Sequence, residues 1–124
     1  MSRVSICIDV SDINKATSFY TQVLGCRIKT EKENSAELEV DNSTIYLVEM
    51  AEYSNPLIEG SDSRRYSRHW TPVHLDFHVT EIETSISLLR EFGGKLEGQK
   101  SGDWGTAAFC ADPFGNGFCM IEIN

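Results

Sequence analysis

Two histidines and an aspartate alternate with apolar residues in the stretch VHLDFHV, residues 73–79. If this stretch is a β-strand, His74, Asp76 and His78 point to one face and the apolar residues to the other. Imidazole and carboxylate groups on one face can bind a metal ion, transfer protons or hold a polar ligand. Residues two apart on a strand are separated by about 6.5 Å, so neighbours in the triplet could share an ion, whereas the two histidines, about 13 Å apart, could not.

The polar face of this strand has two interpretations that the stretch alone leaves open. The face is either wetted surface or the lining of a pocket. His74 could be a hydrogen-bonded wall histidine, or it could be a ligand or a general base. Asp76 and His78 are expected to pair with each other or with solvent near a rim.

An internal repeat places this strand in a larger unit. A shift of 69 residues aligns residues 4–25 with residues 73–94 without a gap. Each copy begins with an alternating strand, continues with a cap and an amphipathic helix, and ends in glycine where a C-cap needs positive φ. We expect Ser11 or Asp12 to cap the first helix, and Thr80 with Glu83 to form a capping box on the second.

Short alternating strands follow each predicted helix, so the unit is β-α-β-β-β and occurs twice. The sequence therefore predicts the α+β class, with two pseudo-symmetric βαβββ modules in one domain, residues 1–124. Within this domain, module one covers residues 1–50, a linker covers residues 51–72, and module two covers residues 73–124. The predicted strands are 26–33, 35–40 and 43–50 in the first copy, and about 94–100, 105–111 and 117–123 in the second.

Composition limits the partners of this chain. The net charge of −8 in 124 residues argues against nucleic acid and anionic membranes, and it favours a neutral or cationic small ligand. No apolar run approaches the roughly 20 residues of a membrane span, and no secretory signal is evident, so we expect a cytoplasmic protein. The four cysteines lie far apart without zinc-finger spacing, which predicts free thiols.

The linker at 51–72 contains two prolines and four serines and is long for a connection inside one domain. It also carries three arginines in the stretch RRYSRHW. Three roles remain open for this segment: an exposed linker, a lid over a pocket, or an arm packed on a second subunit.

Two motifs connect the chain to a known superfamily. IDVSDINKATSFYTQVLG at 8–25 and ADPFGNGFCMIEI at 111–123, together with the duplicated βαβββ unit, resemble the vicinal-oxygen-chelate superfamily. That superfamily holds glyoxalase I, bleomycin-resistance proteins and extradiol dioxygenases, and the chain is most similar to its glyoxalase-like subgroup. The resemblance covers nearly the whole chain and implies a cup-shaped mixed sheet, helices on the outside, and a homodimer.

The resemblance also implies where a divalent ion would bind. Matching the superfamily's ligand positions to this sequence gives Ser5, Tyr46, His74 and Cys119, of which only His74 is a customary ligand. We therefore expect no firm metal site, with His74 as a weak candidate, and no cofactor, although a divalent metal stays an alternative. Strand alternation turns Glu49 and Glu122 toward the helices and away from this site.

The concave side of the cup is the predicted ligand site. Strand alternation places polar and half-polar side chains on this side, including that of Asp9. Trp70 and Trp104 are candidate lids over the cup or stacking surfaces for its ligand. The predicted ligand-binding residues are Ser5, Cys7, Tyr46, Val48, His74, Asp76, His78, Trp104 and Cys119.

Three functional hypotheses follow for this cup. The first is a binding module for a small, cationic organic molecule, without the superfamily's usual metal. The alternative is a divalent-metal-dependent enzyme, similar to glyoxalases or dioxygenases, that uses His74. The third is a structural subunit whose cup is filled by its own side chains. The sequence leaves open whether the protein is an enzyme.

Overall fold

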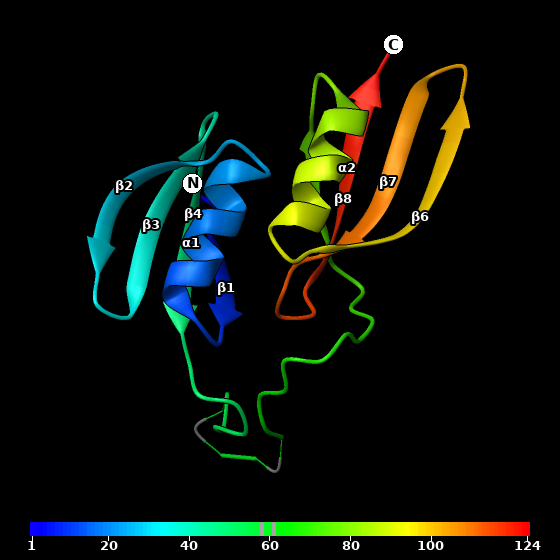
Figure 1. Cartoon of the computed structure of the whole chain (residues 1–124). Helices are drawn as coiled ribbons and strands as arrows, with labels where there is room; N and C mark the ends of the chain where they lie inside the picture. The colour runs from blue at the N-terminus through cyan, green and yellow to red at the C-terminus, as the bar shows by residue number, and fades with distance from the viewer. Residues whose placement is uncertain (58, 61) are drawn as a thin grey trace.

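The computed structural model describes residues 1–57, 59–60 and 62–124. Residues 58 and 61 of the predicted linker lie outside the described residues. The elements follow the predicted order β-α-β-β-β twice (Figure 1). They are β1 (Ile6–Val10), α1 (Ile13–Gln22), β2 (Arg27–Lys32), β3 (Ser35–Val40), β4 (Ser43–Glu49), β5 (Leu75–His78), α2 (Ile82–Glu91), β6 (Lys95–Gly102), β7 (Gly105–Ala111) and β8 (Gly117–Ile123).

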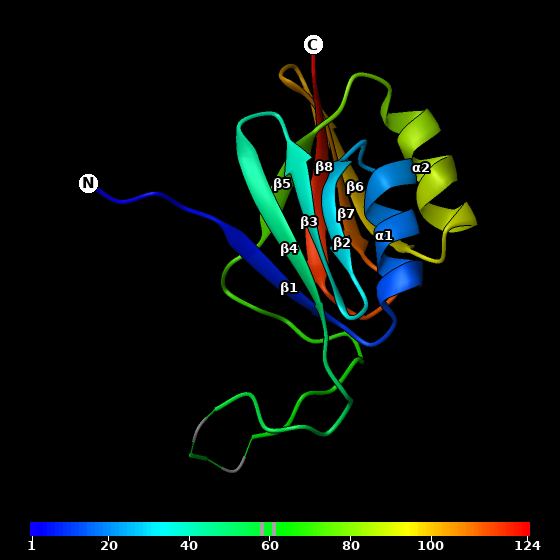
Figure 2. The same ribbon diagram turned by 90° about the vertical axis from the view of Figure 1, so that its left-hand side faces the viewer.

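Each module forms its own four-stranded mixed sheet. The strand order is β1-β4-β3-β2 in the first sheet and β5-β8-β7-β6 in the second, with β1 and β5 parallel to their neighbours and the other pairs antiparallel. Both helices lie on the same side of the two sheets (Figures 1 and 2). The α+β fold class with two βαβββ modules is confirmed.

Alternation in the strands decides which side chains meet the helices. Val10, Ile45 and Leu47 are buried, whereas Cys7 and Tyr46 are cross-strand partners that lie on the other face of the sheet. In α1, the buried positions recur at helical spacing and pack on this apolar face. The opposite faces of both sheets carry no helix within the described ranges (Figure 2).

The helix N-termini are capped in two ways, only one of which was predicted. Asp12 caps α1 as expected, and its carboxylate accepts a hydrogen bond from the amide of Lys15. The capping box predicted for α2 is wrong, because the N-cap is Glu81 and its side chain forms no cap hydrogen bond. Instead, Glu122 of β8 accepts a hydrogen bond from the amide of Ile82 at 2.8 Å.

The same long-range cap occurs in module one. Glu49 of β4 accepts a hydrogen bond from the amide of Ile13 at 2.8 Å. Both carboxylates therefore face the positive ends of helices, as the predicted helix-facing orientation of Glu49 and Glu122 required. The capping signal lies 36 residues from α1 and 40 residues from α2, so no local motif could reveal it.

One aromatic core spans both modules. The ring of Phe19 in α1 lies 6.1 Å from that of Phe118 in β8, and Phe118 lies 5.7 Å from Phe77 in β5. Next to these rings, the hydroxyl of Tyr20 donates a hydrogen bond of 2.7 Å to the buried carboxylate of Asp112. Apolar packing and a buried hydrogen bond thus fix module one against module two.

The DPFGNG turn before β8 forms the polar side of this junction. Asp112 also accepts hydrogen bonds from the amides of Phe114 and Asn116 and from the side-chain amide of Asn116. Asn116 donates a further hydrogen bond to the backbone carbonyl of Asp9 in module one. The turn motif therefore has a structural role, because it ties the end of β1 to the start of β8.

The strand that carries the polar triplet is shorter than predicted. It begins at Leu75, not at Val73, because the hydroxyl of Thr71 donates to the carbonyl of Val73 and holds it out of the ladder. Neither helix in the described part of the chain has the length and apolar character that crossing a bilayer requires.

Candidate functional site

A cavity of about 570 Å³ opens where the two modules meet. One wall comes from β1, the opposite wall from β5 and the residues just before it, and a third from the turn that leads into β8. The linker covers the remaining side with Ser63–Tyr66, His69 and Thr71. Because β1 and β5 are edge strands, the cavity lies between the inner edges of the two sheets.

The floor of the cavity is apolar and aromatic. Tyr20, Phe77 and Phe118 belong to the shared core and also line the cavity, and Ile6 and Ile8 extend the apolar surface along β1. The polar groups lie on the walls and the cover and include Asp9, His74 and Asn116, of which Asp9 pairs with Arg64 of the linker. An apolar floor with a few convergent polar groups is typical of small-molecule sites.

Module one holds the first half of the cover. Arg64 Nε lies 2.8 Å from Asp9 Oδ2, and the Arg64 amide donates to the carbonyl of Ser54. The hydroxyl of Tyr66 donates a hydrogen bond of 2.7 Å to the carbonyl of Met50. The residues between these anchors are therefore fixed over the cavity and do not form a free loop.

Module two holds the second half of the cover. Arg68 forms a bidentate ion pair with Glu97 of β6, with distances of 2.6 and 3.1 Å. The chain lies directly on the DPFGNG turn, since a Cβ at Gly115 would lie 2.6 Å from the carbonyl carbon of Ser67. Gly115 also has a φ of +86°, so both space and backbone conformation require glycine there.

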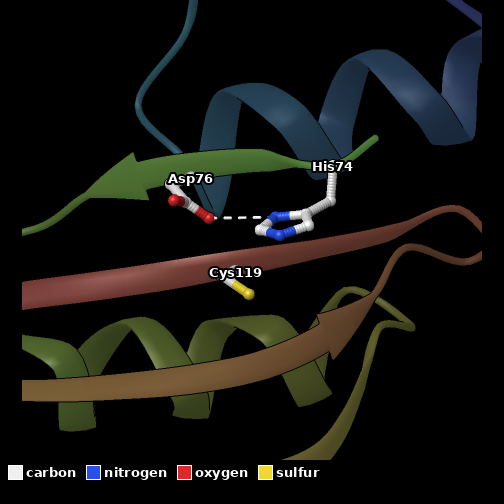
Figure 3. Close-up of side chains that lie close together, drawn as sticks. All are labelled: His74, Asp76 and Cys119. Carbon is white, nitrogen blue, oxygen red and sulfur yellow. Dashed lines mark ion pairs between the residues drawn. The ribbon is translucent and has the colours of Figure 1, made fainter. Parts of the chain in front are cut away.

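A cluster of three potential metal ligands lies on the helix-free face of the second sheet (Figure 3). His74 Nδ1 lies 3.0 Å from Asp76 Oδ1, and Asp76 is the cross-strand partner of Cys119. The potential ligand atoms of these three residues all lie within 4.8 Å of one another. Of the two alternatives expected for Asp76 and His78, pairing with each other is wrong, because Asp76 is paired with His74, whereas His78 is exposed to solvent.

The cluster combines two expectations from the sequence. Superfamily positions gave His74 and Cys119 in this module, and the spacing of the triplet allowed Asp76 to share an ion with His74; the structure brings all three together. Nitrogen, oxygen and sulfur donors at this spacing suit a borderline ion such as Zn²⁺, with positions left for water or a ligand. His74 and Asp76 are exposed and Cys119 is buried, so an ion could enter from the open face.

Two cysteines near the site are neutral thiols. Burial raises the pKa of the Cys119 thiol, and the neighbouring Asp76 carboxylate adds to the increase. Burial likewise raises the pKa of Cys7, with Asp9 adding to the increase and Arg64 opposing it. A reactive cysteine needs a lowered pKa, so neither residue is prepared to act as a nucleophile.

The predicted site residues separate into three groups. Cys7 and His74 line the cavity between the modules, and His74 also reaches a second cavity of about 210 Å³ that contains Cys119, Trp70 and Phe109. Asp76 joins His74 and Cys119 through the cluster. The remaining predicted residues, which line neither of these cavities, are Ser5, Tyr46, Val48, His78 and Trp104.

Sequence reasoning missed several residues that shape the cavity. Tyr20 was assigned only to the helix core, although its ring also forms part of the floor. Arg64 and Arg65 were treated as linker charges, and Asn116 as part of a turn. The only sequence signal for these cavity residues was the concentration of arginines in the stretch RRYSRHW, and it could not show which arginine contacts which module.

Residues 5–121 match the family model described as a glyoxalase-like domain. No curated protein sequence matches this chain. The match spans both modules and the linker between them.

Solved structures show a similar fold across almost the whole chain. FosX, a fosfomycin resistance protein from Listeria monocytogenes, is 13% identical with a TM-score of 0.73, covering 100% of this chain and 94% of its own. A lactoylglutathione lyase from Agrobacterium tumefaciens is 14% identical with a TM-score of 0.65, covering 98% and 92%. A glyoxalase/bleomycin resistance protein from Albidiferax ferrireducens is 18% identical with a TM-score of 0.68, covering 97% of each chain.

A variant of the Listeria FosX was solved with Mn(II) and dihydroxypropylphosphonic acid. It is 15% identical to this chain with a TM-score of 0.70, covering 99% of this chain and 92% of its own. At these identities the similarity establishes the shared fold and leaves the ligand of this chain to be argued from its own residues.

Proposed function

Because the chain belongs to the glyoxalase-like domain family, we propose that it binds a small organic molecule in the cavity between its two modules. The observation that carries this proposal is the cavity itself, with its volume of about 570 Å³ and its aromatic floor. Pockets that enclose small ligands have volumes of about 300 to 1,000 Å³ and few, well-placed polar groups. A side-chain-filled cup, the third hypothesis from the sequence, does not account for such a volume.

The lining residues have distinct roles in this proposal. Tyr20, Phe77 and Phe118 provide an apolar surface that removes ligand area from water. His74 lines both cavities and orients the ligand by a hydrogen bond. Cys7 is a neutral wall residue, in line with its raised pKa.

The other predicted ligand residues extend the same site. Tyr46 and Val48 lie beside Cys7 and Asp9 on the first sheet, in register across β1 and β4. A ligand longer than the cavity would extend over this face near the exposed Ser5, and on the second sheet toward the exposed His78 at the end of β5. We propose that these residues, with Trp104, contact the outer part of such a ligand.

Equilibrium titration tests the binding proposal. The panel combines planar aromatic acids, their amine counterparts and neutral amides, each tested by calorimetry and by thermal shift. At least one class should bind with 1:1 stoichiometry and raise the melting temperature. Failure of every compound to bind would contradict the proposal. Tyr20 and Phe118 also belong to the hydrophobic core, so replacing them would lower the stability of the protein. Cys7→Ala is the better variant of the cavity lining, because it should change ligand affinity and leave stability nearly unaltered.

A second function is favoured by the cluster of His74, Asp76 and Cys119. We propose as the alternative that these residues hold a divalent ion in a metal-dependent enzyme similar to glyoxalases. Such an ion supplies Lewis-acid polarisation of a substrate oxygen. All three donors come from module two, so the cluster does not need the ligand positions Ser5 and Tyr46 of module one.

The residues of the cluster prepare the site in specific ways. The Asp76 carboxylate fixes the imidazole of His74 through the 3.0 Å contact. The Cys119 thiol must lose its proton before it can act as a ligand, and its raised pKa makes this loss costly near neutral pH. Metal affinity should therefore increase as the pH rises.

Metal analysis of protein purified without a histidine tag tests this alternative. Added Zn²⁺ should raise the melting temperature, and His74→Ala and Cys119→Ser should each abolish the increase. His78→Ala is the matched control, because this exposed histidine at the end of β5 lies near the cluster in sequence but outside it. If no stoichiometric metal is found and Zn²⁺ leaves the melting temperature unchanged, the metal-dependent function is wrong.

Assembly and location complete the proposal. We propose that two copies form a homodimer, which sedimentation equilibrium would test. All four cysteines are free, which supports a reducing compartment such as the cytoplasm.

A further inference from the structure

We infer that the ligand of the cavity between the modules is an organic acid, with an aromatic ring on the floor and a carboxylate bound by Arg65 at the rim. This inference rests on the proposed binding function and adds the charge and chemical class of the ligand. The net charge of −8 favoured a neutral or cationic ligand. The groups that line the cavity matter more, because solvent screens charges farther than about 10 Å away.

The cavity lining has an excess of cationic groups. Two arginines of the cover, Arg64 and Arg65, line it against a single acid, Asp9. Arg64 and Asp9 neutralise each other through their 2.8 Å ion pair. Arg65 has no ion-pair partner among the described residues, so one full positive charge stays available at the rim. A cationic ligand would meet this charge without a free carboxylate to balance it.

A second side chain of the cover, His69, adds a hydrogen-bonding group to the side of the cavity where Arg65 lies. His69 lines the cavity, and its Nδ1 lies 3.0 Å from the carbonyl of Ser67, which fixes the ring. The imidazole can carry a second positive charge when protonated, whereas arginine stays charged throughout. A carboxylate is therefore surrounded by donors at this rim, and the planar guanidinium of Arg65 can bind both of its oxygens.

Anchors on both sides hold Arg65 over the cavity. Arg64 is bound to Asp9 and Ser54, and Tyr66 is bound to Met50, so the residues before and after Arg65 are both fixed to module one. Farther along, Arg68 is held by Glu97 of module two. A charge held in this way loses less conformational entropy on binding than one on a free loop.

The floor determines the apolar part of the ligand. Phe77 and Phe118 meet edge to face at 5.7 Å, and Tyr20 lies beside them in the cavity lining. Three aromatic rings favour a ligand ring that can stack or pack at an edge. The class that satisfies both floor and rim is an aryl or indolyl carboxylic acid of modest size.

Titration with a charge-matched pair of probes tests the inference. Indole-3-acetate and tryptamine have the same ring and opposite charges, and indole-3-acetamide is the neutral reference. The acid should bind about tenfold more tightly than the amine at low salt, and added NaCl should reduce the difference. Arg65→Gln should weaken acid binding about fivefold and leave the amide within about twofold.

Asp9→Asn provides a change in the opposite direction. It removes the carboxylate that occupies Arg64, so a second guanidinium becomes available and acid affinity should increase about threefold. Arg90→Gln removes the same charge from the end of α2, outside both cavities, and should leave acid affinity within about twofold.

The outcomes separate the inference from the binding proposal. If tryptamine binds as tightly as indole-3-acetate, or if Arg65→Gln leaves acid affinity unchanged, the inference is wrong while the proposed binding function stands. If none of the three probes binds and the wider panel also fails, both are wrong. Acid selectivity that is lost in Arg65→Gln and kept in Arg90→Gln supports both.

Discussion

The hydrogen bond between Tyr20 and Asp112 offers the sharpest test of how the two modules are joined. The hydroxyl lies 2.7 Å from a carboxylate oxygen that is buried between module one and module two. Tyr20→Phe removes this donor and leaves the ring in place, so almost no cavity is created. A hydrogen bond to a charged group contributes about 1.5 to 3 kcal/mol.

The local structure narrows this range. Asp112 keeps three other donors, namely the amides of Phe114 and Asn116 and the side-chain amide of Asn116. Because the carboxylate is not left without partners, we expect the lower part of the range, about 1.5 to 2 kcal/mol. For a domain of this size the urea midpoint should fall by about 1 M with an unchanged slope.

Urea unfolding at pH 7, followed by far-UV circular dichroism at one fixed protein concentration, measures the effect. Tyr46→Phe is the control, because this half-buried tyrosine forms no side-chain hydrogen bond within the described residues and should change stability by less than about 0.5 kcal/mol. Asp112→Ala should cost more than Tyr20→Phe, since it leaves several donors unpaired. Equal stability of Tyr20→Phe and Tyr46→Phe would refute the proposed link between the modules.

Three further predictions concern the rest of the framework. Glu49→Ala and Glu122→Ala should each lower the free energy of unfolding by about 1 kcal/mol in urea titrations, because each removes a long-range hydrogen bond to the first amide of a helix; a neutral result for both would contradict the capping role. Burial raises the pKa of the Cys110 thiol from 9.0 to about 12. As the pH rises, the unfolded chain therefore loses the thiol proton before the folded chain does. The free energy of unfolding, measured by urea titration, should fall as the pH rises above 9, and it should fall less steeply in Cys110→Ala. Gly115→Ala should displace the cover and speed tryptic cleavage at Arg68, whereas Gly98→Ala should not, because a Cβ there would make only an ordinary contact of 3.7 Å with the Phe109 ring.

The repeat made most of the fold predictable. Strict alternation, helical spacing and turn residues located every strand and both helices, and the strands at 35–40, 105–111 and 117–123 agree with β3, β7 and β8 at both ends. Such local patterns depend on residues close in sequence. The start of β5 was misplaced because Thr71 binds the carbonyl of Val73, a contact that alternation does not encode.

The candidate site was predictable only in part. Strand alternation correctly placed Cys7, His74 and Cys119 on the helix-free faces, since neighbours in register share a face. The linker contacts were not predictable, because Arg64–Asp9 and Arg68–Glu97 join residues 55 and 29 positions apart. The pairing of Asp76 with His74 depends on side-chain rotamers, which a single sequence does not reveal.

Ligand-induced chemical shift changes in the ¹⁵N-labelled chain test the central claim most directly. With the tightest compound of the panel, the largest changes should fall on the amides of β1, of β5 and of the turn at 112–117, which surround the cavity between the modules. Changes confined to the outer surfaces of α1 and α2, or to β2 and β6 at the far edges of the sheets, would contradict the claim that this cavity is the binding site.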